Sequence, residues 1–233
     1  VPDYPVNLFL SREGYLKKIT PQSLRMSGEQ KYKDGDGPFL TWEASNRDEL
    51  LVFTDRQQCY KTRLSEFEDT KASVLGDFVA VKLGMEEGET PIFLAVTDDY
   101  KGHMLFFFAN CKCARVPLSS YATKQNRKKL LNAYSDKEPL AAMLQLPESE
   151  ELAVRTSAGR LLLVHSTQIS EKTTRDSAGV SVITLKKNQT IASVVSADTL
   201  ELANPHRYRV RTLPAAGALL REEDLAEQLQ LTF

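Results

Sequence analysis

The stretch Leu8-Phe9-Leu10-Ser11-Arg12-Glu13-Gly14-Tyr15-Leu16-Lys17-Lys18 contains two short apolar runs on either side of a tight turn. Glycine adopts the positive φ of such turns at no steric cost, and the flanking runs have the length of strands. The pattern returns in three more segments, at residues 51–61, 106–115 and 153–163. The turns fall at Gly14, Gln57, Cys111 and Gly159, so the sequence predicts a fold of repeated β-hairpins.

A second element accompanies the hairpins. Apolar or alternating segments precede three of them and recur once near the end, each after a turn rich in Gly, Asp or Ser. These outer strands are predicted at residues 39–42, 78–83, 140–146 and 180–185. Val79, Val81 and Leu83 alternate with other residues, which is the period of a half-buried strand. A unit of about 40 to 50 residues with several strands is typical of propeller blades.

The two ends of the repeat predict how the fold closes. The outer strand at residues 191–196 has no hairpin after it, and the hairpin at 8–20 has no outer strand before it. Joining them would close a ring and remove open sheet edges. We therefore expect four blades, with a fifth if residues 200–213 add strands. Residues 1–213 form the predicted domain, and residues 214–233 form a tail with a short acidic helix.

The chain has 233 residues, 30 Lys and Arg, 31 Asp and Glu, and a net charge of -1. Hydrophobic residues make up 42% and charged residues 26%, values typical of a globular protein, and no apolar run is long enough to span a membrane. The charge is unevenly distributed, because residues 101–135 contain seven basic side chains and no acid. The near-neutral total therefore does not exclude a partner such as DNA.

Basic residues also follow the turns of the first three hairpins at similar positions. Solvated Lys and Arg on strand edges are one explanation, but their recurrence in equivalent places favours a basic arc along the rim. Such an arc would contact phosphates without reading bases. The predicted DNA-binding residues are Lys17, Lys18, Lys61, Arg63, Lys112, Arg115, Lys124, Arg127, Lys128 and Lys129.

We find no catalytic or metal-binding motif in the sequence. His103, His165 and His206 are far apart, and Cys111 with Cys113 lacks a second ligand pair at zinc-site spacing. An odd number of cysteines favours reduced thiols. We therefore expect no catalytic residue, no metal site and no cofactor in this chain.

Four segments carry a resemblance to a known family. They are residues 10–20, 53–63, 108–118 and 121–130. Over about residues 5–196, the chain resembles the C-terminal domain of the A subunit of bacterial type IIA topoisomerases, the family of DNA gyrase and topoisomerase IV. The first segment is the most specific, whereas Gln57 and Cys111 stand where a turn glycine is usual.

The resemblance implies an all-β fold, the β-pinwheel, a propeller-like disc whose blades exchange strands. It implies that double-stranded DNA is bent around a basic rim and presented to the cleavage core. The parent would be an ATP-dependent topoisomerase, an isomerase. Its catalytic residues, Mg²⁺ and ATP would lie in other parts of the holoenzyme.

Partners would be DNA, the core of the same chain and the ATPase subunit, without a membrane, and the location would be cytoplasmic. The chain begins at Val1 without a signal sequence, which favours a fragment of a longer protein.

One departure from the family bears on activity. Gyrase-type domains carry a Gln-Arg-Arg-Gly-Gly-Lys-Gly box after the first hairpin, and residues 24–37 lack it. A parent similar to topoisomerase IV is therefore more consistent with the sequence than a gyrase. The alternative from another class is a propeller-type protein-interaction module, which would expose an apolar patch and would not bind DNA.

Overall fold

In the computed structural model, which describes residues 1–124, 128–184 and 188–229, the strands form four small sheets of one plan. Each sheet has a hairpin at its centre, an outer strand beside the first hairpin strand, and a short strand beside the second. The prediction of an all-β fold with four hairpin units is confirmed. Residues 200–213 contribute the 3₁₀ turn Pro205–Arg207 and add no fifth sheet within the described part of the chain.

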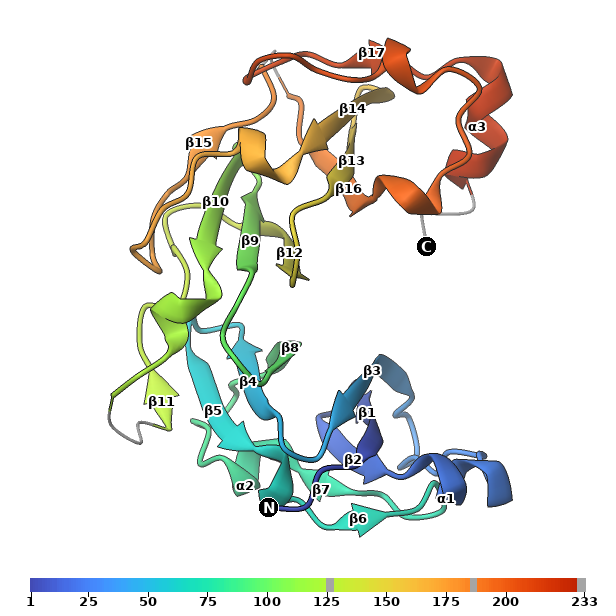
Figure 1. Ribbon diagram of the computed structural model, residues 1–233, viewed down its shortest axis with the longest axis vertical. Helices are drawn as coiled ribbons and strands as arrows, with labels where there is room; N and C mark the ends of the chain where they lie inside the picture. Colours follow the sequence, from blue (N-terminus) through green and yellow to red (C-terminus); the bar gives the residue numbers. More distant parts are fainter. Residues whose placement is uncertain (125–127, 185–187, 230–233) are drawn as a thin grey trace. The chain divides into compact units, whose positions relative to one another are not determined.

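The chain divides into two compact units, which we describe separately. One unit contains Val1–Tyr100 and Thr123–Ala133. Its sheet 1 has the order β3 (Pro38–Ser45), β1 (Pro5–Ser11), β2 (Tyr15–Ile19) and β6 (Asp69–Thr70), and β7 (Asp77–Phe78) also pairs with β2. Its sheet 2 has the order β8 (Pro91–Thr97), β4 (Glu49–Thr54), β5 (Cys59–Arg63) and β11 (Lys129–Leu130), as Figure 1 shows.

The other unit contains Lys101–Ala122 and Tyr134–Phe233. Its sheet 3 has the order β12 (Leu140–Leu146), β9 (His103–Phe108), β10 (Lys112–Pro117) and β15 (Val180–Ser181). Its sheet 4 has the order β16 (Ile191–Ser196), β13 (Glu151–Thr156), β14 (Arg160–His165) and β17 (Ala218–Leu219).

The turns lie where the sequence places them. Gly14, Gln57, Cys111 and Gly159 have φ values of 94°, 55°, 66° and 74°. In all four sheets the register between the first hairpin strand and the outer strand shifts close to this turn. The four hairpins are therefore structural repeats, although two of them use a non-glycine residue in the left-handed region.

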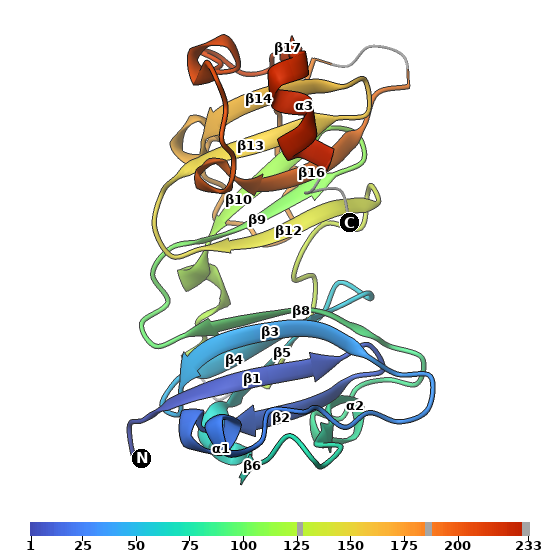
Figure 2. The same cartoon turned by 90° about the vertical axis from the view of Figure 1, so that its right-hand side faces the viewer.

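The assignment of the outer strands needs a correction. Each outer strand pairs with the hairpin that precedes it, so β3 joins β1 and β16 joins β13 (Figure 2). We expected the hairpin at 8–20 and the strand at 191–196 to complete each other. Instead, the hairpin has its own outer strand, β3, and the strand at 191–196 is the outer strand of the fourth hairpin. The short fourth strand of sheet 4 is β17, which comes from the predicted tail.

The segment at residues 78–83 is not a strand. It forms the end of β7 and the one-turn helix α2 (Val79–Lys82), and the outer strand of sheet 2 is β8. Val79 is buried, whereas Val81 is 78% exposed, so the two do not share a face as they would in a strand. Of the predicted strand 180–185, β15 accounts for Val180–Ser181, and residues 185–187 lie outside the described residues.

The short returning strands approach the hairpins closely. A Cβ atom on Gly76, just before β7, would lie 2.5 Å from the backbone oxygen of Leu16. On Gly179, just before β15, it would lie 2.4 Å from the backbone of Cys113. Both glycines have positive φ, so only glycine fits without displacing the hairpin.

Each unit has its own apolar core. Leu8, Leu50 and Leu94 are among the buried residues of the first unit, and Phe107 and Val164 are among those of the second. The remaining helices are α1 (Pro21–Met26), capped at its start by the Thr20 side chain, and α3 (Glu222–Leu229), which lies where the acidic helix is predicted.

The residues around α3 are fixed to sheet 4. The Tyr208 hydroxyl donates to the carboxylate of Asp224, which also accepts from the backbone of Ala203 at 3.0 Å. Both Tyr208 and Asp224 are buried. Residues on both sides of the predicted boundary at 213/214 therefore contribute to this sheet, while the boundary itself remains a prediction.

Candidate nucleic-acid interface

Lys17 and Lys18 lie on β2, and both side chains are buried, with 2% and 3% of their surface exposed. The Lys18 ammonium donates to Asn46 Oδ1 at 2.6 Å and to the Leu64 carbonyl at 3.0 Å, and it lies 3.3 Å from the carboxylate of Asp69. These contacts join β2 to segments that follow later in the chain. Lys18 therefore holds these later segments against β2 in the interior of the fold.

Lys17 has a similar place, but its ammonium contacts neutral groups. It donates to the carbonyls of Lys31 and Ala72 at 3.1 and 3.0 Å and lies 5.5 Å from the centre of the Tyr32 ring. Burial lowers the pKa of Lys17. Because neither ammonium group is presented to solvent, we withdraw Lys17 and Lys18 from the proposed phosphate-binding set.

Lys61 and Arg115 occupy the position equivalent to Lys18 in sheets 2 and 3, four residues after the turn. Lys61 donates to Thr123 Oγ1 at 3.1 Å, and Arg115 donates through Nε to the carbonyl of Ile169 at 2.7 Å. Both side chains are half-buried. In sheet 4 the equivalent residue is the buried Leu163. The recurrence that predicted a basic arc therefore reflects, in part, cations that fasten later segments to a hairpin.

Other predicted residues are accessible. Arg63, Lys124, Lys128 and Lys129 are exposed, and Lys112 on β10 is half-buried. Arg127 lies outside the described residues. Except for Lys112, which belongs to the second unit, these accessible cations are part of the first unit.

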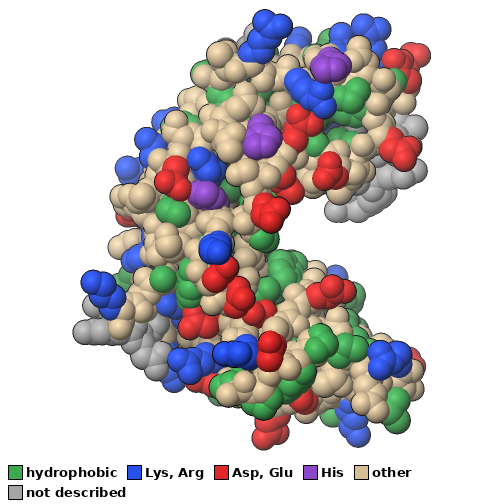
Figure 3. All heavy atoms as spheres, viewed as in Figure 1, with side chains coloured by type: hydrophobic (Ala, Val, Ile, Leu, Met, Phe, Trp, Pro, Cys, Tyr) green, Lys and Arg blue, Asp and Glu red, His purple; other side chains and the backbone are tan. Residues whose placement is uncertain are grey.

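A hollow of about 290 Å³ collects three lysines of this unit. Its lining residues are Lys61, Thr62, Glu66, Lys82, Leu83 and Lys128. Figure 3 shows Lys and Arg side chains (blue) gathered over β5, β11 and α2, in the lower left of the view. Three cations and one carboxylate around an open hollow form a surface that can hold an anion such as a phosphate group.

Lys82 was not among the predicted residues. Its ammonium donates to the Glu66 carbonyl at 3.0 Å and lies 4.6 Å from the centre of the Phe67 ring. The residue belongs to α2, which the alternating pattern assigned to a strand. If residues 78–83 formed a strand, nothing would predict that Lys82 and Lys128 line the same hollow. No local sequence signal therefore identifies Lys82.

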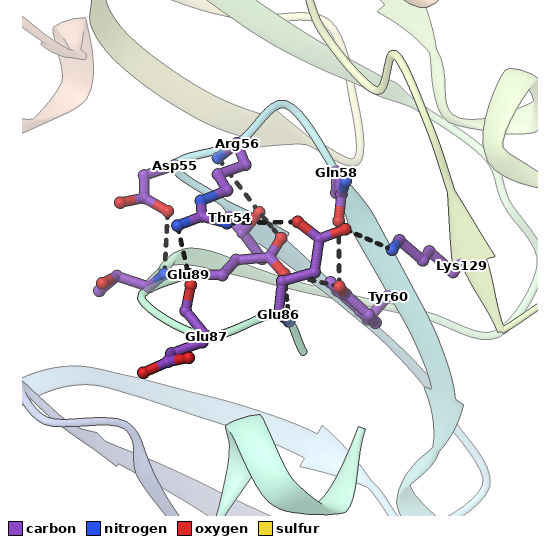
Figure 4. Close-up of polar contacts among 10 residues, drawn as sticks. Thr54, Asp55, Arg56, Gln58, Tyr60, Glu86, Glu87, Glu89 and Lys129 are labelled. Atoms are coloured by element: carbon purple, nitrogen blue, oxygen red, sulfur yellow. Dashed lines mark hydrogen bonds and ion pairs between the residues drawn. The ribbon is translucent and has the colours of Figure 1, made fainter. Parts of the chain in front are cut away.

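The exposed end of β11 contacts a second polar cluster. The Lys129 ammonium lies 3.2 Å from Glu86 Oε1 and 5.7 Å from the centre of the Tyr60 ring. Glu86 Oε2 lies 3.3 Å from Arg56, so one carboxylate bridges two cations (Figure 4). Lys129 and Arg56 together lower the pKa of Glu86.

The three histidines and the Cys111–Cys113 pair belong to the second unit. His103 lies 2.6 Å from Glu171, and burial raises the pKa of Cys113, whose thiol is enclosed. Among the described residues, no group of three His, Cys, Asp or Glu side chains could hold a metal ion. No helix in that part of the chain is long and apolar enough to cross a membrane.

Four small sheets that exchange short edge strands define a β-pinwheel domain. The C-terminal domain of DNA topoisomerase IV is similar, with a TM-score of 0.73 at 20% identity, covering 96% of this chain and 76% of that one. The ParC C-terminal domain of E. coli gives a TM-score of 0.71 at 13% identity, with 94% of both chains covered. The DNA gyrase A C-terminal domain gives 0.62 at 14% identity, covering 95% and 80%.

The sequence comparisons give relatives of the same kind. Residues 48–73 and 150–198 match the family described as DNA gyrase C-terminal domain, beta-propeller. The chain is 26% identical over 212 residues to the A subunit of DNA topoisomerase 4 from Staphylococcus aureus, covering 87% of this chain and 26% of the relative. It thus spans about a quarter of that relative's length. The predicted resemblance to the C-terminal domain of a type IIA topoisomerase A subunit is confirmed.

Proposed function

We propose that this chain is a non-catalytic domain that binds and bends double-stranded DNA and presents it to the cleavage core of a topoisomerase. The observation that carries the proposal is the exposed basic surface of the first unit, with Lys61, Lys82 and Lys128 around one hollow. Arg63, Lys124 and Lys129 extend this surface, and Lys112 and Arg115 are further candidates in the second unit. Lysine and arginine contacts of this kind hold the DNA backbone without selecting a sequence.

The proposal places catalysis outside this chain. The cleavage chemistry, Mg²⁺ and ATP would belong to the rest of an ATP-dependent type IIA topoisomerase located in the cytoplasm. The core of the same polypeptide and the ATPase subunit would be the protein partners. The relative from Staphylococcus aureus, of which this chain covers 26%, supports this arrangement.

We further propose that the parent acts as topoisomerase IV does rather than as a gyrase. Residues 24–37 lack the gyrase-type box. In its place Lys31 and Tyr32 contact the buried Lys17. The relative from Staphylococcus aureus, which is the A subunit of DNA topoisomerase 4, supports the same assignment.

A titration of linear duplex DNA at two salt concentrations tests the proposed DNA binding. If about four phosphates are engaged, the logarithm of the binding constant should fall with the logarithm of salt at a slope of about -3.6. Replacing Lys124 and Lys128 with Glu should abolish most of the affinity. The control exchanges Lys71 and Lys137 for Glu, which makes the same charge change at exposed positions elsewhere.

An equal loss in both double variants would show that only net charge matters and would overturn the assignment of this surface. No binding of the unaltered chain at low salt would refute the proposal and favour a protein-interaction module. The exposed Phe78 and Val81 would then be the first apolar contacts to test.

A further inference from the structure

The loop between α2 and β8 carries a carboxylate between two cations. Glu86 lies 3.3 Å from Arg56 through Oε2 and 3.2 Å from Lys129 through Oε1. Arg56 is on the hairpin turn of sheet 2, and Lys129 is on the returning strand β11. Two segments distant in sequence thus converge on one carboxylate, as Figure 4 shows.

A buried carboxylate fixes this loop from the protein side. Glu89 is 6% exposed, and it accepts from the Tyr60 hydroxyl at 2.6 Å and from the Thr54 hydroxyl. It also accepts from the backbone of Glu86 at 3.0 Å, while the Glu86 carbonyl accepts from the backbone of Glu89 at 3.1 Å. The backbone of Glu86 is therefore held in place, with its side chain directed toward the two cations.

The loop is also joined to the hairpin turn on both sides of Arg56. The second guanidinium nitrogen of Arg56 donates to the Glu87 carbonyl at 2.8 Å, and Thr90 donates through its backbone to Asp55 at 2.9 Å. These contacts keep Arg56 beside the loop. The backbone positions that carry Arg56 and Lys129 belong to sheet 2, since Arg56 lies on its hairpin turn and Lys129 on β11.

The exposure of the three side chains makes the carboxylate replaceable. Arg56, Glu86 and Lys129 expose 44%, 48% and 36% of their side chains. Ion pairs at such positions contribute little to stability, so their exchange for another anion costs little. A DNA phosphate also carries one negative charge on two oxygens, and arginine and lysine bind both kinds of anion by charge-assisted hydrogen bonds.

We propose that Arg56 and Lys129 form a seat for one DNA phosphate, and that Glu86 occupies this seat as an internal competitor when DNA is absent. The inference rests on the proposed DNA binding and adds to it a binding residue, Arg56, and a restraining residue, Glu86. Binding would exchange one anion for another on the same two cations. The folded positions of the loop and of β11 would remain unchanged.

Glu86→Gln tests the competition, with Glu87→Gln as the matched control. Both substitutions remove one negative charge from the same loop, but Glu87 contacts Arg56 through its backbone carbonyl. In the 233-residue chain, Glu86→Gln should tighten binding of a linear duplex by about fivefold beyond any gain in Glu87→Gln. Its salt slope should match that of the unaltered chain, because the same phosphates are bound in both complexes.

A double variant checks that the gain in DNA affinity depends on the seat formed by Arg56 and Lys129. Glu86→Gln combined with Arg56→Gln should lose the extra affinity, because one of the two cations of the seat is then missing. Equal affinities of Glu86→Gln and Glu87→Gln, with measurable binding by the unaltered chain, would overturn the seat and leave the proposed function standing. No DNA binding by any of these proteins at low salt would refute both.

Discussion

Two Lys-Lys pairs in the first unit have the same sequence and opposite surroundings. Lys17 and Lys18 on β2 are buried and bonded to carbonyl, amide and carboxylate oxygens. Lys128 and Lys129, at β11, are exposed, and one lines a hollow while the other pairs with a surface carboxylate. The difference separates cations that hold the fold together from cations that can bind a partner.

The difference follows from which strand carries the pair. β2 is the second strand of a hairpin, and the returning strands β6 and β7 pair with it, so it is not an edge strand. β11 is itself a returning strand at the edge of sheet 2. Edge strands commonly carry lysine, which discourages unwanted pairing. Of these two pairs, the one at the returning strand is therefore the candidate for DNA contact.

The largest expected effect comes from Lys18. Lys18→Met should reduce the free energy of unfolding by about 3 kcal/mol, because it leaves Asn46, Leu64 and Asp69 without their shared donor. Urea unfolding measures the loss, with Lys128→Met as the control. A loss below about 1 kcal/mol would show that the buried ammonium is not the tie that its contacts indicate.

Lys17→Met should destabilise less, by about 1 kcal/mol, since the Lys17 ammonium donates to two neutral carbonyls, whereas that of Lys18 also lies beside a carboxylate. The pKa of Lys17 is lowered below the ordinary value of 10.5 by burial, so the native protein releases this proton before the unfolded chain does. Lys17 therefore makes stability rise with pH as the pH approaches 10.5. Urea unfolding at several pH values should show this rise missing in Lys17→Met, and an unchanged pH dependence would contradict it.

Much of the fold could be predicted because it is encoded locally. The turns at Gly14, Gln57, Cys111 and Gly159 show in the sequence as breaks between apolar runs, and all four have positive φ. The strand at 140–146 is found with its predicted bounds. The strand prediction for residues 78–83 was wrong because alternation over a few residues does not distinguish a strand from a single helical turn.

The site could be predicted only in part, because exposure depends on segments distant in sequence. Lys18 is buried by Asn46 and Leu64, and nothing near Lys18 in the sequence indicates this. The same holds for the outer strands, whose partner hairpin is set by tertiary pairing. Arg56 was missed since its importance depends on Lys129, which comes from the returning strand.

Tyr60→Phe tests the buried contacts of Glu89, which hold the loop that carries the exposed Glu86. It donates to Glu89 at 2.6 Å, and burial, followed by the Glu89 carboxylate, raises its pKa well above the ordinary value of 10.0. Its contribution to stability is complete below about pH 10 and is lost as the pH rises further, since the unfolded chain ionises first. Tyr60→Phe should cost about 1 kcal/mol at neutral pH and flatten the alkaline loss.

Urea unfolding between about pH 8 and pH 10.5 provides the measurement for Tyr60. The control is Tyr32→Phe, in which a half-buried tyrosine of the same unit loses its hydroxyl. Parallel pH curves for Tyr60→Phe and the unaltered chain would mean that the hydroxyl is not held against Glu89 as the distances indicate.

The smallest effect on stability is expected for Lys128, and it completes the comparison. Lys128→Met should change the free energy of unfolding by less than about 0.5 kcal/mol, because the side chain is exposed. Its DNA affinity should nevertheless fall, with a salt slope shallower by about 0.9 for one lost phosphate contact. Lys18→Met should do the reverse, because its folded fraction keeps every exposed cation. Both variants should be measured by urea unfolding and by duplex titration. If the returning strand carries the binding cations, Lys128→Met loses DNA affinity but little stability, and Lys18→Met loses stability but little affinity. A loss of affinity in folded Lys18→Met equal to that in Lys128→Met would place β2 back in the interface and refute the distinction.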